Sequence, residues 1–334
     1  MRNINRRAFL ASLVAAGVVV GTAACGDDSG DGNTGSGELQ EVNVGYIADF
    51  NGASLVAVAQ EQGLWAKHGL KPNLKVFTNG PLQVQALNAG DLDFGYLGPG
   101  ALWLPASGQA KVIAVNSLGL ADRVIAKPGI TSIAALKGKT VGVPEGTSGD
   151  MILRLALAQG GLSIDDVKKV AMDASTVVTA FGSGQIDAAG IWYPLVGTIK
   201  KQVPDLVELA KNEDFPQTNF PTVFVARNEV AEGKKDLTSK VAGLIREAND
   251  FRAANLEQTI AATVKLTQGP EANFKAEAEN VRFLTSTEID AATADGSVNN
   301  WFKSLNELFV SFGKLQTATD PATYYLGDVY TSAK

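Results

Sequence analysis

Short apolar segments with strand character alternate with helix-like segments along the first third of the chain, and this alternation constrains the fold most. Strands are expected at 42–46, 74–77, 92–96 and 111–118. Helices are expected at 55–67 and 82–89, each ended by a glycine, Gly69 or Gly90. Strands that alternate with helices favour a parallel sheet covered by helices. The chain is therefore predicted to be an α/β protein.

Ligands of such sheets bind beyond the carboxyl ends of the strands. In this chain the segments 47–54, 97–101 and 116–122 follow those ends, and we expect 48–54 to be a loop. Asp49 in that loop could pair with an ammonium group of a ligand, although loop aspartates more often cap a helix or face water.

The stretch Gly138 to Asp150, GKTVGVPEGTSGD, predicts a strand, a glycine-rich turn and the start of a helix. The first turn of a helix has backbone N–H groups without intrahelical partners, and a small anion or polar group can bind there. Thr147 and Ser148 could cap this helix or offer their hydroxyl groups to a ligand. The stretch alone leaves both interpretations open.

A second α/β unit is predicted to be inserted into the first. Strands at 123–127 and 221–227 flank this block, which also contains a helix at 176–182 and a strand at 186–191. The segments 86–95 and 180–189 have similar patterns. Each predicts the end of a helix, then a glycine, and then a strand that begins after Leu-Asp or Ile-Asp. We therefore predict lobe 1 from 41–122 and 222–334, lobe 2 from 123–221, and two chain crossings between them. The helical pattern from 236 onward is expected to wrap lobe 1.

The N-terminal segment has the features of an export signal. Arg2, Arg6 and Arg7 precede an apolar run that is too short for a comfortable membrane span, and the small residues before Cys25 resemble a lipobox with Thr22 in the place of the usual leucine. The paired arginines resemble a twin-arginine signal. We expect 1–24 to be the signal peptide and 25–40 to be a lipidated cysteine with a flexible tether. The alternative is a plain cleaved signal and a free cysteine.

Charge and residue inventory exclude several functions. The formal charge of −6 becomes −9 once the three arginines of the signal are removed, and no basic patch points to nucleic acid. The chain has one cysteine, Cys25, and one histidine, His68. These cannot form a Cys/His metal cluster or a Ser–His or Cys–His catalytic pair. We expect no metal, no cofactor and no enzymatic activity.

Several short motifs in order resemble one family. They are Val44-Gly45-Tyr46, Glu61-Gln62-Gly63-Leu64-Trp65, His68-Gly69-Leu70, Ala86 to Asp93, Leu136 to Pro144, Gly184 to Ala188 with Trp192 and Pro194, and Phe283-Leu284-Thr285. Over residues 41 to 330 the chain resembles the extracytoplasmic solute-binding proteins of ABC importers for nitrate, taurine, aliphatic sulfonates and thiamine-pyrimidine precursors. The resemblance implies the type II periplasmic-binding-protein fold, whose two lobes are joined by a hinge of two crossings. It also implies a monomer that closes on a small organic solute and presents it to the permease, at the extracytoplasmic face of the membrane.

The predicted ligand-binding residues come from both lobes. They are Phe50, Asn51, Leu97, Gly98 and Asn116 in lobe 1, and Thr147, Ser148, Trp192 and Tyr193 in lobe 2. Backbone N–H and hydroxyl groups at 98–100 and 147–149 would receive oxygens of an anion, and Trp192 with Phe50 would cover an apolar or cationic tail. Taurine or an alkanesulfonate is the expected solute. An aromatic or heterocyclic acid or a thiamine-pyrimidine precursor is the alternative, and a lipoprotein sensor that binds a protein partner is a second one.

Overall fold

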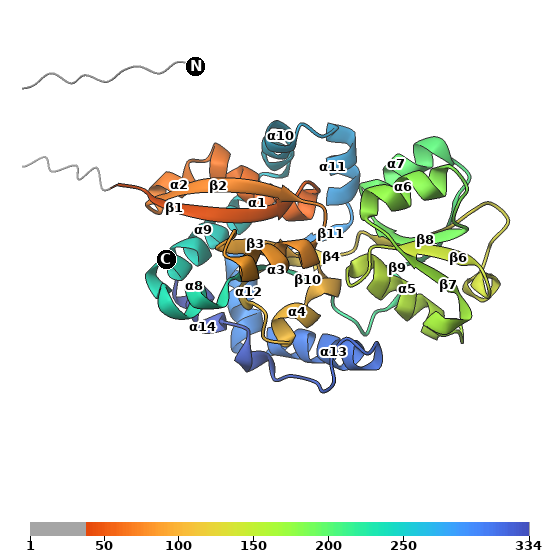
Figure 1. The fold of residues 1–334 in the computed structure, drawn as a ribbon. Helices are drawn as coiled ribbons and strands as arrows, with labels where there is room; N and C mark the ends of the chain where they lie inside the picture. Colours follow the sequence, from red (N-terminus) through yellow and green to blue (C-terminus); the bar gives the residue numbers. More distant parts are fainter. Residues whose placement is uncertain (1–37, 334) are drawn as a thin grey trace, which may run out of the picture. The chain divides into compact units, whose positions relative to one another are not determined.

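The computed structural model describes residues 38–333, so the predicted signal peptide, Cys25 and nearly all of the tether lie outside the described residues. Within the described part, two separate β-sheets are covered by helices, as Figure 1 shows. The predicted α/β class is therefore confirmed.

The first sheet has six strands in the order β11-β4-β10-β3-β1-β2. Their bounds are β1 Gln40–Ile47, β2 Leu70–Phe77, β3 Phe94–Leu97, β4 Lys111–Gly119, β10 Pro221–Ala226 and β11 Val281–Phe283. β1 runs parallel to β2 and β3, whereas β10 runs antiparallel to β3 and β4. We call the part of the chain built around this sheet lobe 1.

The second sheet has five strands in the order β7-β6-β8-β5-β9. Their bounds are β5 Asp122–Ala126, β6 Thr140–Val143, β7 Lys168–Ala171, β8 Ala188–Trp192 and β9 Val207–Lys211. β6 is parallel to β7 and β8, and β5 is antiparallel to β8 and β9. This part is lobe 2. The chain crosses from β4 to β5 and returns from β9 to β10, which is the predicted two-lobed arrangement with two crossings.

Lobe 2 is a layered α/β unit. Its helices are α5 Ser148–Gln159, α6 Ala174–Gly182 and α7 Leu195–Gln202, with short 3-10 turns at Ile133–Leu136, Ile164–Asp166 and Asn212–Asp214. The apolar face of α5 packs with Val124, Val141 and Ala188 in one hydrophobic cluster. α6 and α7 pack with Ile125, Ala189 and Ile191 in another, and Figure 1 shows them across the sheet from α5. Neighbouring residues of β5 and β8 thus face opposite layers, as strand alternation requires.

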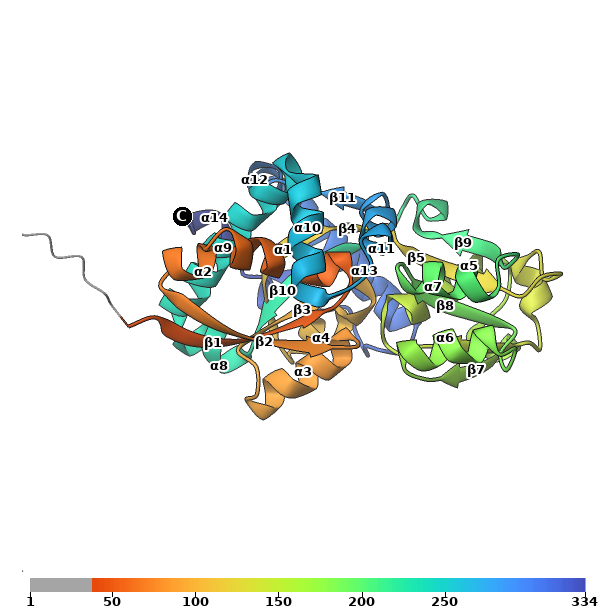
Figure 2. The same ribbon diagram turned by 90° about the horizontal axis from the view of Figure 1, so that it is seen from above.

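Lobe 1 contains the remaining helices. They are α1 Phe50–Glu61, α2 Leu64–Lys67, α3 Gly80–Ala89, α4 Trp103–Ala106, α8 Asn228–Gly233, α9 Lys235–Ala254, α10 Leu256–Thr267, α11 Glu271–Ala278, α12 Ser286–Ala294, α13 Ser297–Ser311 and α14 Gly327–Ser332, with 3-10 turns at Pro99–Ala101 and Pro321–Thr323. Figure 2 shows α10 and α11 lying beside α1. The predicted helical wrapping of lobe 1 after residue 236 is confirmed.

The start of α1 differs from the prediction. The segment 48–54 was expected to be a loop, but α1 begins at Phe50 because its first N–H groups have acceptors. Asp49 Oδ1 accepts from Gly52 N at 2.7 Å, and Glu277 of α11 accepts from Phe50 N at 2.7 Å and Asn51 N at 3.0 Å. Carboxylates at these positions also suit the positive end of the helix. The expected single helix at 55–67 is divided at Gly63, whose φ of 67° belongs to the left-handed region.

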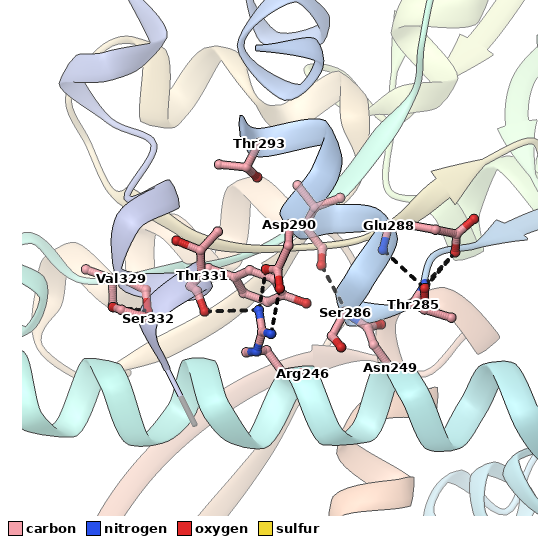
Figure 3. Close-up of polar contacts among 12 residues, drawn as sticks. Arg246, Asn249, Thr285, Ser286, Glu288, Asp290, Thr293, Val329, Thr331 and Ser332 are labelled. Carbon is pink, nitrogen blue, oxygen red and sulfur yellow. Dashed lines mark hydrogen bonds and ion pairs between the residues drawn. The ribbon is translucent and has the colours of Figure 1, made fainter. Parts of the chain in front are cut away.

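The C-terminal helices are fixed to the long helix α9 by polar contacts, which Figure 3 shows in close-up. Arg246 of α9 donates to both carboxylate oxygens of Asp290 in α12 and to the Tyr330 carbonyl of α14. Asp250, one turn further along α9, accepts from both N and Oγ of Ser286 at 2.7 Å. The two hydrogen bonds between the planar guanidinium of Arg246 and the carboxylate of Asp290 hold these side chains in one orientation. The end of the chain is therefore part of the folded unit of lobe 1.

Among the described residues, every helix is too short or too polar to cross a lipid bilayer.

Candidate ligand-binding site between the lobes

A small cavity lies where residues of the two lobes meet. Its volume is about 40 Å³, and its wall contains, from lobe 1, Ile47, Asp49, Asn51, Asn79, Gly80, Tyr96, Gly98, Pro99, Ala101, Gly119, Ala121, Thr222 and Glu277, and from lobe 2, Asp122, Thr147, Ser148, Trp192 and Tyr193. The wall includes the segments that follow β1, β3 and β4, as the ligand-binding rule for open α/β sheets requires.

Three carboxyl groups face this cavity from three distant parts of the chain. Asp49 precedes α1, Asp122 opens β5 at the first crossing, and Glu277 lies near the end of α11. Their exposed fractions are only 6%, 4% and 1%. Buried acids without an ion-pair partner are costly, so a group of three is a feature that needs a physical explanation.

Burial and mutual repulsion act on Asp49 and Glu277. Burial raises the pKa of Asp49 to about 6, although the N–H of Gly52 and the indole of Trp192 oppose the shift. Burial and the neighbouring charge of Asp49 raise the pKa of Glu277 well above its ordinary value, despite its bonds to the start of α1. Two carboxyls that share one site do not ionise independently. A positive charge placed between them would favour the ionised forms.

Asp122 is held by a reciprocal contact with the second crossing. Its backbone N–H donates to Asn212 Oδ1 at 2.7 Å, and Asn212 Nδ2 donates to Asp122 Oδ2 at 3.1 Å. Burial raises the pKa of Asp122, while Ser148, Asn212 and the charge of Arg123 lower it in part. The carboxyl is thereby fixed at the point where the two lobes join.

The cavity wall contains no lysine, arginine or histidine. The nearest guanidinium groups are directed elsewhere. Arg123 donates to Glu208, to the carbonyls of Leu120 and Asp122, and to Asn280. Arg252 of α9 is fully buried behind the wall, where it donates to Ser54, Asn116 and Asn249. The cavity wall therefore contains acidic side chains and no basic one.

Six of the nine predicted ligand-binding residues line the cavity. They are Asn51, Gly98, Thr147, Ser148, Trp192 and Tyr193. Asn51 is 6% exposed, its amide oxygen accepts from Ser117 Oγ at 2.8 Å, and its amide nitrogen has no acceptor among residues 38–333. Thr147 is the residue before α5, but its hydroxyl donates back to the Pro144 carbonyl at 2.6 Å instead of capping the helix.

Phe50, Leu97 and Asn116 were also predicted to bind ligand, and the structure places them behind the wall. Phe50 is fully buried against Phe283 with ring centroids 5.9 Å apart, because helix α1 begins one turn earlier than expected. Leu97 belongs to the main core of lobe 1. Asn116 is fully buried and donates to the Asn51 carbonyl and to Thr222 Oγ1. These three residues support the wall and do not line it.

The segments expected to receive anion oxygens lie against each other. Gly100, in the turn after β3, lies so close to the Thr147–Ser148 peptide that a Cβ atom there would collide with the Thr147 carbonyl. Nearby, Trp103 Nε1 donates to the Gly146 carbonyl at 3.2 Å across the same junction. The lobes are therefore in direct contact at this edge, and the space between 98–100 and 147–149 is largely filled by the protein itself.

Sequence reasoning missed Asp122, Glu277 and Tyr96, and it weighed Asp49 without selecting it. The signal for Asp122 was its place at the start of a strand at the predicted crossing. Glu277 stands within the helical stretch EANFKAEA, where no local pattern distinguishes it from an exposed glutamate. Its partners at 50 and 51 are more than 220 positions away, so only the folded structure brings it to the cavity.

A second, wider depression of about 410 Å³ adjoins the first. It shares Ile47, Asp49 and Trp192 with the small cavity, and the rest of its wall consists of Ala48, Val76, Phe77, Thr78, Leu82, Ala174, Ser175, Pro194 and Leu195. We call it the apolar groove. Among the described residues, no cluster of His, Cys, Asp and Glu has the arrangement of a metal site.

Two α/β lobes with two crossings and a cavity at their junction define the class of two-lobed binding proteins. The family described as NMT1/THI5 like matches residues 52–259, more than half of the chain, and the chain belongs to this family.

Individual relatives agree with this membership. A Brucella abortus protein whose name states only that it binds is 57% identical over 292 residues, which are 87% of this chain and 92% of that protein. The taurine-binding periplasmic protein of Escherichia coli is 26% identical, over 86% of this chain and 92% of that one. The crystal structure of the periplasmic aliphatic sulphonate binding protein of Escherichia coli has the same fold, with a TM-score of 0.66, 21% identity, and coverage of 87% of this chain and 99% of that one. The predicted family and fold are thus confirmed.

Proposed function

We propose that this protein is the solute-binding component of an ABC importer, and that it holds a small organic solute carrying a protonated amine in the cavity between its lobes. The observation that carries the proposal is the cavity itself, which both lobes line and which contains Asp49, Asp122 and Glu277 without a basic side chain. Closure of two lobes around a solute buries most of its surface, as delivery to a permease requires.

The acidic side chains of the cavity wall should favour the binding of some sulfonates over others. A plain alkanesulfonate would bring a negative charge towards three buried carboxyls, and like charges at short distance oppose binding strongly. Taurine carries an ammonium group as well as its sulfonate, so its positive end could pair with the acids. Among the solutes for which the relatives are named, taurine is therefore the candidate that the geometry favours.

An aromatic or heterocyclic amine, such as a thiamine-pyrimidine precursor, is the second candidate. Trp192 and Tyr193 supply two rings at the cavity wall. The Tyr193 hydroxyl is already held by Glu208 and Lys200 at 3.0 Å each, which fixes its ring for stacking. An aromatic acid without a positive group is disfavoured for the same reason as an alkanesulfonate.

The cellular setting is part of the proposal. A lipid on Cys25 and the tether after it would hold the folded part at the extracytoplasmic face and raise its effective concentration near the permease. In this setting the protein works as a monomer with one solute and releases it unchanged. The alternative is a lipoprotein sensor that recognises a protein partner.

A matched pair of solutes tests the proposal. Taurine and isethionate share the ethanesulfonate skeleton and differ in an amine against a hydroxyl. We expect the purified full chain to bind taurine, or another amine of a panel that includes aminopyrimidines, and to leave isethionate and ethanesulfonate unbound in calorimetry. Asp49→Asn keeps a good N-cap residue and should weaken binding at least tenfold. If isethionate or ethanesulfonate binds, the proposed requirement for an amine is refuted. If no solute of the panel binds, the alternative of a lipoprotein sensor is favoured. Mass spectrometry of the released solute distinguishes a binding protein from an enzyme.

A further inference from the structure

The apolar groove, of about 410 Å³, adjoins the small cavity, and the proposed binding of an amine does not account for it. Its wall combines β2 and the start of α3 from lobe 1 with the end of β8 and the starts of α6 and α7 from lobe 2. Any molecule that fills it would therefore touch both lobes.

Exposed apolar side chains are concentrated in this groove. Val76 is 61% exposed and Leu82 is 41% exposed. They are two of only four large hydrophobic residues that are this exposed among the described residues, and Phe77 and Leu195 stand beside them, half-buried. Apolar residues that gather at a hollow, instead of being scattered singly, mark a place where something binds.

The sizes of the two spaces are complementary. The small cavity of about 40 Å³ has room for about three water molecules, since one water needs roughly 10–15 Å³ on this scale. This is enough for an ammonium group with its nearest carbon atoms, and a larger solute must extend further. Asp49 and Trp192 border both spaces, so the groove begins where the small cavity ends.

We infer that the apolar groove is the second half of the solute site and receives an apolar chain or ring attached to the amine that the small cavity holds. This inference rests on the proposed function and, among the amines that it allows, favours those with an apolar tail over taurine. The head would lie among Asp49, Asn51 and Asp122, where the Asn51 amide nitrogen is free to donate to a polar atom of the solute. The tail would pass Trp192 and lie on Val76 and Leu82.

A homologous series of primary amines from ethylamine to pentylamine, with phenethylamine, measures the tail directly. Calorimetry on the purified full chain at one pH should show affinity rising about fourfold per methylene until the groove is filled. The double variant Val76→Thr with Leu82→Gln should remove most of this increment and leave ethylamine binding unchanged. Both side chains are exposed, so neither change threatens the core. Val170→Thr, at an exposed apolar position of β7 outside the groove, is the matched control.

Each outcome is decisive. A rise with chain length that the double variant abolishes and the control keeps supports the inference. If ethylamine or taurine binds but affinity does not change with chain length, the inference about the apolar groove is overturned and the proposed function still stands. Loss of cellular uptake by the double variant without any change in solute binding would assign the groove to the permease and also overturn the inference. If no amine and no taurine binds, both proposals fail.

Discussion

Lys314 of lobe 1 donates a hydrogen bond to Glu145 of lobe 2, with 3.2 Å between Nζ and Oε1. Glu145 also accepts from Lys169 of its own lobe, and these two lysines lower its pKa. Lys314 also lies over the ring of Trp103, whose indole donates to the Gly146 carbonyl. This group of contacts joins the two lobes beside the cavity.

Removing the lysine should loosen the closed arrangement. Glu145 is about half exposed, so Lys314→Ala is expected to weaken solute binding only a few-fold, mainly through a faster off-rate. Stopped-flow dissociation measures this directly. Lys71→Ala removes an exposed ion pair within lobe 1 and should leave the rate unchanged. Equal rates for both variants would show that the contact does not hold the lobes.

A single methyl group at Gly100 should prevent closure. A Cβ atom there would collide with the Thr147 carbonyl, whereas one at Gly233 meets nothing within 4 Å. We expect Gly100→Ala to weaken solute binding roughly tenfold or more, since overpacking of this kind costs about 1–3 kcal/mol, and Gly233→Ala to bind as the parent does. Unfolding midpoints of both variants check that each remains folded. Parental affinity in Gly100→Ala would mean that the lobes can close without this contact.

Amine binding should depend on the ionisation of Asp49. Its pKa is raised to about 6, mainly by burial, and Asp122 adds to the shift, while Glu277 and Tyr96 also face it. A protonated amine needs the ionised carboxyl. Affinity should therefore fall up to tenfold per unit as the pH drops below about 6, and be nearly constant above it. Calorimetry from pH 5 to 8 measures this, and Asp49→Asn should bind weakly with a flatter profile.

The same shift has a consequence for the protein without solute. The folded-state pKa of Asp49 lies above its ordinary value of 3.8, so the folded state binds more protons between those values. The contribution of Asp49 to stability is therefore fully present below pH 3.8 and is lost as the pH rises through 6. The difference in unfolding free energy between the parent and Asp49→Asn should decrease over this window. A difference that increases with pH would contradict the direction of the shift.

Arg252 should be essential for the stability of lobe 1. Burial lowers its pKa to about 9, and its guanidinium donates to Ser54 in α1, Asn116 in β4 and Asn249 in α9. Arg252→Met leaves these groups without their donor, at an expected cost of about 2–5 kcal/mol in urea unfolding. Lys303→Ala, at an exposed helical position, should cost little. A small effect of Arg252→Met would mean that water replaces the guanidinium.

The internal echo in the sequence predicted a real structural equivalence. Asp93 Oδ2 accepts from Asn43 N of β1, and Asp187 Oδ2 accepts from Thr140 N of β6. Each aspartate thus joins the start of one strand to its parallel neighbour, at the entrance of the sheet, as the repeated Leu/Ile-Asp pattern indicated. Arg227 and Lys127 pair with the two aspartates in the same way. Local sequence patterns of this kind predict well where strands lie and where they begin.

The acidic character of the cavity could not be predicted in the same way. The sequence indicated which strand ends face the cleft, and six of nine chosen residues do line the cavity. The balance of charge there depends on Glu277, which arrives from a helix near the end of the chain, and on the direction in which Arg123 and Arg252 point. Those directions follow from tertiary packing. A glycine-rich loop before a helix therefore predicted an anion, whereas the acids of the assembled wall are the basis on which we propose a solute with a positive group.

Asp49 and Glu277, the two acids that lobe 1 contributes to the cavity wall, also accept hydrogen bonds from the first turn of α1. Altering either one to suit another nutrient would also weaken the start of that helix. Tyr193 of lobe 2 is only partly buried and caps no helix, so a change there disturbs less of the fold. On the proposed function, descendants of this protein that bind other solutes should therefore diverge first at Tyr193, and the proposed preference for a positive group should outlast the preference for a particular molecule.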